Sequence, residues 1–427
     1  GGLMQNTGYF KGKNVTIVGL ARSGLACANL LHSLGARVRV TDINNGPQVK
    51  SSVIRFSSPD IAYELGRHSE EFISGADMVV VSPGVPWTSQ PVLWAKEKGK
   101  QIMGEIEVAG MLCQAEIIAV TGSNGKTTVT TLIGKMLEKA GRNCFVCGNI
   151  GNPFSAEVGR MKKGDFAVIE VSSFQLETII KFRPKIAVML NLTPNHLDRY
   201  KDMSEYTEAK KRIFMNQERG DFLVLNADDQ VLKSFAGGAR PRVVFFDGRG
   251  RLNPDQSAVE AVGRIIGVKP EIINRVFGEF KGIEHRMEEV AEIRGVRFIN
   301  DSKATTADSA IWAIRNISSP ILLIAGGRHK GIDYRVIIEA ARGKVKQAFL
   351  IGEAKDIIAA GLEGEIPVRK VSSLKEAVEG SYENAGPGDC VLFSPMCSSF
   401  DMFRDYEQRG EAFKKIVFDL SRNEQGK

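Results

Sequence analysis

The segment AVTGSNGKTT at residues 119–128 constrains the fold of this chain more than any other feature. The apolar run at 116–120 predicts a strand that enters the segment. From Thr127 onward apolar residues recur at helical spacing until Gly141. In this order, a strand and a helix joined by a glycine-containing loop are typical of a site that holds phosphate groups. The order therefore predicts an α/β domain with a nucleotide-binding loop.

The loop itself supplies the groups that a polyphosphate needs. Gly122 and Gly125 let backbone N–H groups close on an anion, and the start of the helix adds the positive end of its dipole. Lys126 can place a charge on the outer phosphates, and the hydroxyl of Thr127 can hold a magnesium ion. The loop is a shorter G-x-x-G-K-T variant, because Val120 stands where the common pattern has its first glycine. A tight turn with a solvated lysine is the alternative, and the order of elements favours phosphate binding.

Length and charge narrow the class of protein. At 427 residues the chain is long enough for two to four domains, and 43% hydrophobic residues suffice for several cores. The net charge is +7 and the basic residues are scattered, which favours an anionic small molecule over nucleic acid as the ligand. We find no run of membrane-spanning length and no signal-peptide pattern, so we expect a cytoplasmic protein. Residues 1–3, before Met4, are expected to be a cloning remnant.

The six cysteines are spread along the chain without a framework of close spacings, so we expect free thiols. Cys144 and Cys147 form a lone C-x-x-C in an apolar, strand-like run. The sequence offers no second pair and no nearby histidine to complete a zinc site. Structural burial is therefore favoured over redox or metal chemistry for this pair.

The N-terminal segment has the pattern of a Rossmann-like opening. Predicted strands at 13–18 and 37–40 flank a predicted helix at 25–34, and the second strand ends on Asp42, where a ribose-binding acid would lie. Ala21, however, replaces the middle glycine that a dinucleotide pyrophosphate requires. The pattern argues against NAD and leaves two interpretations open: a nucleotide-sugar site, or a βαβ unit without a ligand.

A further predicted strand at 77–81 leads into a rigid turn, SPGVP, at 82–86. Such turns present ligand-binding loops at the carboxyl ends of parallel strands. Residues 100–115 are interpreted as the boundary to the second α/β domain, which the phosphate loop begins.

An acidic residue follows the phosphate loop at the end of another apolar strand. The strand at 165–171 carries Glu170 near its carboxyl end, and a buried carboxylate is costly unless it is paired. A magnesium ligand beside the phosphates is the favoured interpretation, and a buried hydrogen-bonded glutamate is the alternative.

The next predicted strand, at 185–190, leads to His196, which stands among polar residues. A metal ligand and a packed histidine are equally compatible with this position. The predicted helix at 204–215 carries Lys210, Lys211 and Arg212, which taken alone would be a solvated face.

The third segment opens near Arg286 and repeats the theme of strands that end in polar or glycine-rich loops. Predicted strands at 296–299, 321–325 and 391–393 indicate a second Rossmann-like domain, whose ligand crevice we expect to face the phosphate loop. The loop GGRHKG at 326–331 binds an anion in the favoured interpretation and is an ordinary charged turn in the other.

Taken together, seven motifs make the chain resemble the Mur ligases: TGSNGKTT, EVSSFQLE, NLTPNHLDRY, EHRME, NDSKATT, GGRHKG and SPMCSSFDMFRDYEQRG. The phosphate loop is shared with folylpolyglutamate synthetases and indicates the class only. The combination of SSFQLE, DRY and SFDMF is similar to the branch that adds D-glutamate. The resemblance implies three α/β domains: a Rossmann-like domain at 1–105, a central ATP-binding domain at 106–284 and a Rossmann-like domain at 285–427.

The resemblance also implies a reaction and its partners. ATP would phosphorylate the alanyl carboxylate of UDP-N-acetylmuramoyl-L-alanine, the amine of D-glutamate would attack the acyl phosphate, and phosphate would leave. Magnesium would be the cofactor, and the domains would close on their ligands. No nucleic acid is expected as a partner, and a monomer is expected.

By the same resemblance, Lys126, His196 and Lys210 are expected to be catalytic. The ATP site would comprise Gly122, Ser123, Asn124, Gly125, Lys126, Thr127, Thr128, Asn149, Arg286 and Asp301. Magnesium would be held by Thr127, Glu170, His196 and a carbamylated Lys210. The substrate site would comprise Ser23, Asp42 and Gly84 at the UDP portion, Ser172 and Gln175, and Lys303, Thr305, Lys330, Ser399 and Tyr406 near D-glutamate.

Two positions depart from the family pattern. Asn195 stands where the family usually has an acid, and the segment between Asp247 and Ser257 is short and lacks the usual His-Asn…Asn segment. The sequence leaves open whether that loop is truncated or residues are absent. The alternatives to this ligase are another Mur ligase, a folylpolyglutamate synthetase-like enzyme and a non-catalytic nucleotide-binding protein.

Overall fold

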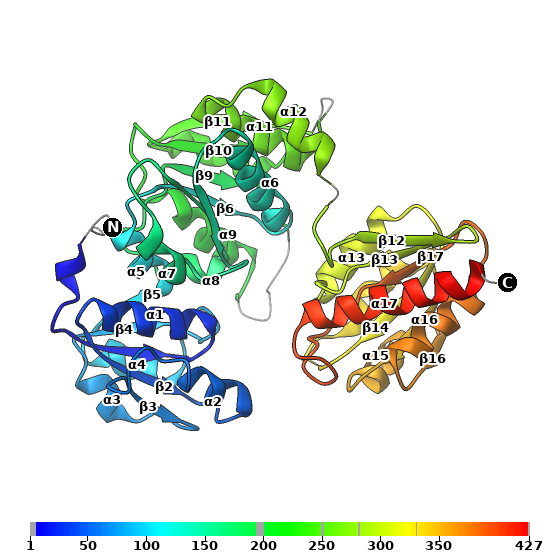
Figure 1. The fold of residues 1–427 in the computed structure, drawn as a ribbon, viewed down its shortest axis with the longest axis horizontal. Helices are drawn as coiled ribbons and strands as arrows, with labels where there is room; N and C mark the ends of the chain where they lie inside the picture. The colour runs from blue at the N-terminus through cyan, green and yellow to red at the C-terminus, as the bar shows by residue number, and fades with distance from the viewer. Residues whose placement is uncertain (1–5, 194–199, 249–251, 281, 330, 426–427) are drawn as a thin grey trace. The chain divides into compact units, whose positions relative to one another are not determined.

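The computed structural model of the chain describes residues 6–193, 200–248, 252–280, 282–329 and 331–425. The chain divides into two compact units, residues 1–280 and residues 281–427, which are described separately here (Figure 1). The described part of the chain contains no helix that is both long and apolar enough to cross a membrane.

The first sheet of unit 1 is wholly parallel, with strand order β3-β2-β1-β4-β5. The connections run outward in both directions from β1, so a crevice is expected where β1 and β4 end. The strands are β1 (Asn14–Val18), β2 (Arg37–Asp42), β3 (Ala62–Leu65), β4 (Met78–Val81) and β5 (Gln101–Gly104). The helices are α1 (Arg22–Ser33), α2 (Pro47–Val53), α3 (Glu70–Ser74), α4 (Gln90–Glu97) and α5 (Glu105–Leu112).

The second sheet of unit 1 is also parallel, with strand order β11-β10-β9-β6-β8-β7. Both of its faces are buried, because Ile117 and Ala119 of β6 belong to one hydrophobic cluster and Ile118 and Val120 to another. Its central strands are accordingly continuous apolar runs. The strands are β6 (Glu116–Thr121), β7 (Cys144–Gly148), β8 (Phe166–Glu170), β9 (Ile186–Met189), β10 (Phe222–Asn226) and β11 (Arg242–Phe246). The helices are α6 (Lys126–Lys139), α7 (Phe154–Glu157), α8 (Ser173–Leu176), α9 (Met203–Lys211), α10 (Gln230–Ser234), α11 (Pro254–Ile266) and α12 (Pro270–Glu279).

Two buried acids of α5 fasten the two sheets of unit 1 together. The Glu107 carboxylate accepts hydrogen bonds from the backbone N–H groups of residues 180, 181 and 182 at 2.8–2.9 Å. Glu105 accepts one from the N–H of Ser155 at 2.6 Å. A single hydrophobic cluster also runs from Phe10 to Leu232 across both sheets. Residues 100–115 therefore connect the two sheets by buried contacts, and the domain boundary at 105 stays a prediction.

Unit 2 contains a sheet of order β12-β13-β17-β14-β15-β16, in which the β12–β13 pair is antiparallel and the other pairs are parallel. The strands are β12 (Glu288–Ile293), β13 (Val296–Asn300), β14 (Ile321–Gly326), β15 (Val345–Ile351), β16 (Val368–Lys370) and β17 (Cys390–Phe393). The helices are α13 (Ala307–Asn316), α14 (Ile338–Ala341), α15 (Lys355–Leu362), α16 (Leu374–Glu383) and α17 (Tyr406–Gln425).

The predicted α/β class with parallel sheets is confirmed, as is every strand that the sequence indicated. The edge strands β3, β5, β11, β12 and β16 were not predicted, because exposed edge strands alternate less clearly than buried ones. All six cysteines are free thiols, as expected. Cys144 and Cys147 lie on β7, where the expected burial is found for Cys147, while Cys144 is only half-buried.

Candidate functional site

The phosphate loop joins the end of β6 to the start of α6, as the sequence predicts. Gly125 precedes the helix with φ +81°, a left-handed conformation that favours glycine. A Cβ atom there would also lie 2.5 Å from Oδ1 of Asp255, the second residue of α11. The loop thus brings the start of a 14-residue helix, with its positive dipole end, to the carboxyl edge of the sheet.

Residues that follow β9 hold the loop in place. The side chain of Asn191 accepts a hydrogen bond from the N–H of Asn124 at 2.8 Å and donates one to the Asn124 carbonyl at 3.1 Å. The Ser123 hydroxyl donates to the carbonyl of Thr193 at 3.0 Å and accepts from its N–H at 2.9 Å. No role was predicted for Asn191, although its position directly after a buried strand was a signal for one.

Two lysines converge on the first glycine of the loop. Lys126 donates to the carbonyl oxygens of Gly122 and Ser123 at 2.9 and 3.1 Å. Lys210, from α9, donates to the same Gly122 oxygen at 3.0 Å and to the Thr121 hydroxyl at 3.3 Å. Lys210 is only 2% exposed, so the interpretation of this residue as part of a solvated face is wrong.

Burial and then the positive charge of Lys126 hold the pKa of Lys210 well below its usual range, while Glu170 acts in the opposite direction. Among the described residues no carboxylate lies within ion-pair distance of its ammonium group. Lys210 is therefore a lysine whose charged form is disfavoured, and it lies directly beneath the phosphate loop.

Glu170 lies at the end of β8, whose register places it beside Val120 of β6 and Gly148 of β7. It is 2% exposed, and its Oε1 accepts a hydrogen bond from the side chain of Asn149 at 2.8 Å. Its other oxygen, Oε2, is buried and has no hydrogen-bond partner among the described residues. A buried carboxylate oxygen without a partner is costly, and a hard cation such as Mg²⁺ prefers oxygen ligands. The residues at this edge therefore fit a magnesium ion.

A pocket of about 570 Å³ opens in unit 1 where β1 and β4 end. Asp42 shapes it, because its two carboxylate oxygens accept hydrogen bonds from the N–H groups of Leu20 and Asn44 at 2.6 and 2.8 Å. Gln175 lies on its central-sheet side, within a capping box that Ser172 forms at the start of α8. Five of the residues predicted for ATP or substrate line this one pocket: Ser23, Asp42, Gly84, Asn149 and Gln175.

In unit 2, Asp301 follows β13 and is 4% exposed. It accepts hydrogen bonds from the Ser394 hydroxyl at 2.9 Å and from the N–H of Met287 at 3.2 Å. Burial raises the pKa of its carboxyl to about 7, against the opposing effects of these two hydrogen bonds and of Arg286. The carboxyl group is thus poised to titrate near neutral pH.

The other residues predicted for unit 2 gather at the same edge of its sheet. The N–H of Lys303 donates to the carbonyl of His285 at 3.0 Å, and its ammonium lies 5.7 Å from the ring of Tyr406. Ser399 is 2% exposed, and Thr305 is partly buried in the loop after β13. His196 and Lys330 lie outside the described residues.

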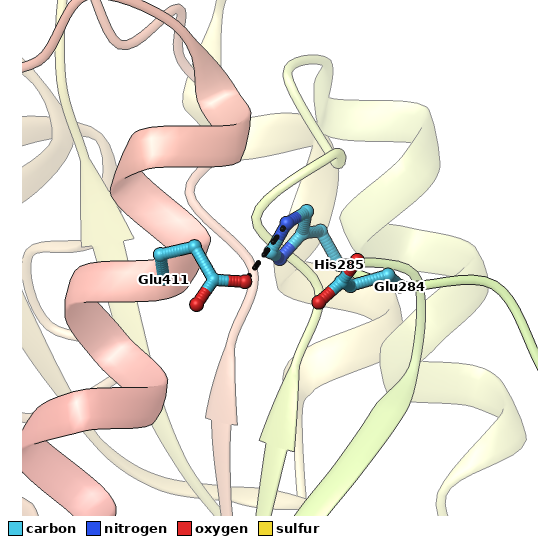
Figure 2. A group of neighbouring side chains, drawn as sticks. All are labelled: Glu284, His285 and Glu411. Atoms are coloured by element: carbon cyan, nitrogen blue, oxygen red, sulfur yellow. Dashed lines mark ion pairs between the residues drawn. The ribbon is translucent and has the colours of Figure 1, made fainter.

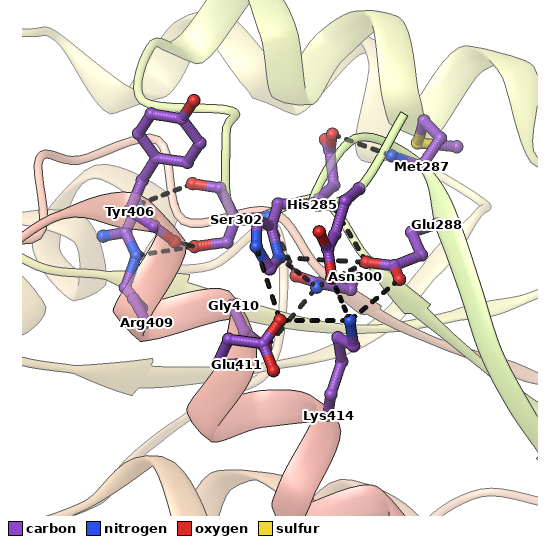
Figure 3. A network of polar contacts seen from close by, with 12 residues as sticks. His285, Met287, Glu288, Asn300, Ser302, Tyr406, Arg409, Gly410, Glu411 and Lys414 are labelled. Carbon is purple, nitrogen blue, oxygen red and sulfur yellow. Dashed lines mark hydrogen bonds and ion pairs between the residues drawn. The ribbon is translucent and has the colours of Figure 1, made fainter. Parts of the chain in front are cut away.

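Glu284, His285 and Glu411 form a cluster with the donor types of a metal site (Figure 2). The ammonium of Lys414, however, lies between the two carboxylates of this cluster: it is 3.1 Å from Glu411 and donates to Glu284. It also lies 3.2 Å from the neighbouring carboxylate of Glu288. Hydrogen bonds to these carboxylates raise the pKa of Lys414 despite its partial burial. The cluster already contains its cation, so it is an ion-pair network (Figure 3).

Comparison with protein-family models gives three matches in chain order. They are the Mur ligase MurD-like N-terminal domain at residues 13–104, the Mur ligase middle domain at 120–262 and the Mur ligase glutamate ligase domain at 285–397. Together the matches span most of both units.

Curated proteins named UDP-N-acetylmuramoylalanine–D-glutamate ligase match almost the whole chain. The protein from Thermoanaerobacter pseudethanolicus is 40% identical over 451 aligned positions, covering 96% of this chain and 99% of its own length. The protein from Alkaliphilus oremlandii is 41% identical, with coverage of 96% and 99%.

Solved structures with a similar fold are more distant in sequence. A pseudomurein peptide ligase type C from Methanothermus fervidus has a TM-score of 0.57 at 16% identity, over 96% of this chain and 100% of that one. MurF ligase from Thermotoga maritima, solved in complex with ADP, has a TM-score of 0.58 at 15% identity, over 90% and 95%. At these identities the likeness concerns the fold alone.

Proposed function

The chain belongs to the Mur ligase family, and from this we infer that it is an ATP-dependent ligase that adds D-glutamate to UDP-N-acetylmuramoyl-L-alanine in peptidoglycan synthesis. The observation that carries the proposal is the 40% identity, over nearly the full length of both chains, to curated ligases named for this reaction. Lys126, Lys210 and Glu170 lie at the phosphate loop, and they support the proposal because phosphoryl transfer needs cationic groups and a magnesium ligand.

A carboxylate is a poor electrophile, so it must be activated before an amine can attack it. In the proposed reaction an oxygen of the alanyl carboxylate attacks the γ-phosphorus of ATP, giving an acyl phosphate and ADP. The amine of D-glutamate then attacks the acyl carbon, loses a proton, and expels inorganic phosphate as the amide forms. Lys126 and the amides at the start of α6 would stabilise negative charge on the phosphoryl group in transfer.

Magnesium would be held by Thr127, Glu170, His196 and Lys210, as the family resemblance implies, and would neutralise phosphate oxygens when bound. The unpartnered Oε2 of Glu170 supports its place in this set. Asn149 would keep the Glu170 carboxylate oriented through its hydrogen bond to Oε1.

We further propose that Lys210 carries a carbamate, formed when its neutral amine adds to CO₂ with loss of a proton. The side chain is buried beside the phosphate loop and has no carboxylate partner among the described residues. A carbamate would convert this cation into an oxygen ligand for magnesium. After incubation with ¹³C-bicarbonate, a ¹³C carbamate resonance should be present in the native protein and in Lys211→Met. The resonance should be absent in Lys210→Met, and its presence there would reject the assignment.

We assign the pocket beside Asp42 to the UDP portion of the substrate, with Ser23, Gly84 and Gln175 in its wall. Asp301 and Arg286 would contribute to the ATP site, and the residues near D-glutamate would be Lys303, Thr305, Lys330, Ser399 and Tyr406. The domain limits at 105 and 284 accord with the ranges of the three family models. Because ATP and a nucleotide sugar are its substrates, we place the enzyme in the cytoplasm, and we propose that it is a monomer.

The deciding experiment measures phosphate release and product mass with ATP, magnesium and UDP-N-acetylmuramoyl-L-alanine. D-glutamate is compared with L-glutamate, L-lysine and diaminopimelate, and Lys126→Ala serves as the inactive control. Product with D-glutamate alone is the expected result. If product formed with another amino acid, the enzyme would belong to a different branch of the ligases. If ATP were hydrolysed and no amino acid stimulated the reaction, the ligase assignment would be overturned.

A further inference from the structure

One arginine in unit 2 is completely buried and yet forms no ion pair with an acid among the described residues. Arg409, in the first turn of α17, is 0% exposed. Its Nε donates to the Ser302 hydroxyl at 3.1 Å, and one terminal nitrogen donates to the Ser302 carbonyl at 2.8 Å (Figure 3). The other terminal nitrogen donates to the Cys397 carbonyl at 3.1 Å. Within the described part of the chain, no carboxylate lies within ion-pair distance of the guanidinium.

Such an arrangement is expensive, so it calls for an explanation. Burial lowers the pKa of Arg409 to about 10, a shift in the direction expected for a cation removed from water. The space around the group is also tight, because a Cβ on Gly327 would lie 3.1 Å from the guanidinium. A leucine or methionine would fill the same volume at lower electrostatic cost.

The three hydrogen bonds connect two loops that lie far apart in the sequence. Ser302 sits in the loop after β13, between Asp301 and Lys303, whereas Cys397 sits in the loop after β17, two residues before Ser399. Ser302 extends the connection, because its hydroxyl donates to the carbonyl of Tyr406 at 2.8 Å. A planar guanidinium with several fixed donors can hold both backbones at a set spacing, which a flexible lysine cannot do.

The two loops carry four of the five residues assigned above to D-glutamate: Lys303 and Thr305 on the first, and Ser399 and Tyr406 on the second and at the start of α17. We propose that Arg409 is a positioning residue for the amino-acid substrate, fixing the spacing between these two loops so that both engage one D-glutamate. This inference rests on the proposed function and names a residue that acts through others, without itself touching substrate.

Loss of Arg409 should shift the loops and leave the sheet intact. The pairing of β13 with β17 does not involve the side chain. A backbone hydrogen bond from the N–H of Met396 to the carbonyl of Ala304, at 2.8 Å, also connects the two loops, so the loss of Arg409 should change their spacing without separating them. The first loop also begins with Asp301, assigned above to ATP, but that carboxylate is held by Ser394 and by the N–H of Met287 and accepts no hydrogen bond from Arg409. A displacement of the two loops should therefore weaken the binding of D-glutamate far more than that of the other two substrates.

The test is steady-state kinetics of the full-length enzyme for each of the three substrates, with Arg409→Met as the main variant. The KM for D-glutamate should rise by about tenfold or more, while the KM for ATP changes by less than about threefold. The KM for D-glutamate in Arg409→Lys should lie between those of Arg409→Met and the native enzyme, because an ammonium has three donors on one nitrogen and can reach only some of the acceptors. Arg422→Met on the same helix, where the side chain is 82% exposed, should match the native enzyme.

Ser302→Ala provides a second route if Arg409→Met does not fold, because it removes only the contacts of the hydroxyl with Arg409 and Tyr406. It should raise the KM for D-glutamate in the same direction by a smaller factor. An unchanged KM for D-glutamate in the folded variants, or equal rises for all three substrates, would overturn the inference. A native enzyme that makes no product from D-glutamate would instead refute the proposed function.

Discussion

Lys126 and Lys210 donate to one and the same acceptor, the carbonyl oxygen of Gly122, at 2.9 and 3.0 Å. Two ammonium groups that share an acceptor repel each other, and this repulsion adds to burial in lowering the pKa of Lys210. To reach a phosphate, Lys126 must exchange the Gly122 and Ser123 carbonyls for phosphate oxygens. In this structure the Lys126 ammonium is therefore hydrogen-bonded to the backbone of its own loop.

Substitution of Lys126 by methionine should therefore affect function far more than folding. We expect ligase activity to fall by about 10³-fold or more, because the charge that stabilises the transferring phosphoryl group is lost. The thermal midpoint should change by only a few degrees, since the side chain is only part-buried where it donates to the carbonyls of its own loop. Lys135→Met, at an exposed position of the same helix, is the matched control and should be fully active.

Glu170→Gln keeps the shape of the side chain but removes its charge. We expect the rate to fall by about 100-fold or more and the magnesium concentration for half-maximal rate to rise, because a neutral amide is a poorer ligand than a carboxylate. Titration of the rate with magnesium chloride measures both effects. Glu116→Gln, at the exposed start of β6, is the control for the loss of one negative charge. If Glu170→Gln and the native enzyme showed the same magnesium dependence, Glu170 would be excluded as a magnesium ligand.

Asp301 should make unit 2 less stable as the pH rises through neutrality. Its carboxyl has a pKa of about 7 in the folded protein against a usual value of 3.8, so the folded form binds the proton more tightly. This contribution is fully present below pH 3.8 and is lost as the pH rises through about 7. Between pH 5 and 8 the loss should be about 2 to 3 kcal/mol.

Asp301→Asn tests this dependence because its amide stays neutral at every pH. The free energy of opening, measured by hydrogen exchange of the β13 amides without ligands, should fall with pH in the native protein and less so in the variant. Parallel pH profiles for the two proteins would show that Asp301 is already ionised at pH 5.

Gly410 should tolerate no side chain, because α17 passes directly over His285. A Cβ at this position would lie 2.2 Å from Nδ1 of His285, which also contacts the side chain of Asn300 at 2.9 Å. We expect Gly410→Ala to lower the free energy of unfolding by about 1 to 3 kcal/mol. Gly278→Ala in α12, where a Cβ meets nothing within 4 Å, should be neutral or stabilising. Equal stability of both variants in urea would contradict the packing described.

The sequence predicted the α/β sheets and the phosphate loop because both depend on local signals, namely apolar strands, glycines and the lysine that follows them. It predicted Glu170 from a single acid in an apolar strand. Asn191, Glu107 and Arg409 could not be found in this way, because their roles depend on partners far away in the chain. The role predicted for Lys210 came from the resemblance to a family. The helical pattern alone predicted that this lysine lies on a solvated face.

The pocket beside Asp42 draws all its described lining residues from positions 19–175, within one unit. A fragment screen against this enzyme could therefore concentrate on a single cavity whose described lining lies within unit 1. Ala21 and Arg22 stand in that wall where NAD-dependent enzymes require a close approach of the backbone to pyrophosphate. Compounds shaped to the bulk of those two side chains would have a physical basis for sparing NAD-dependent dehydrogenases.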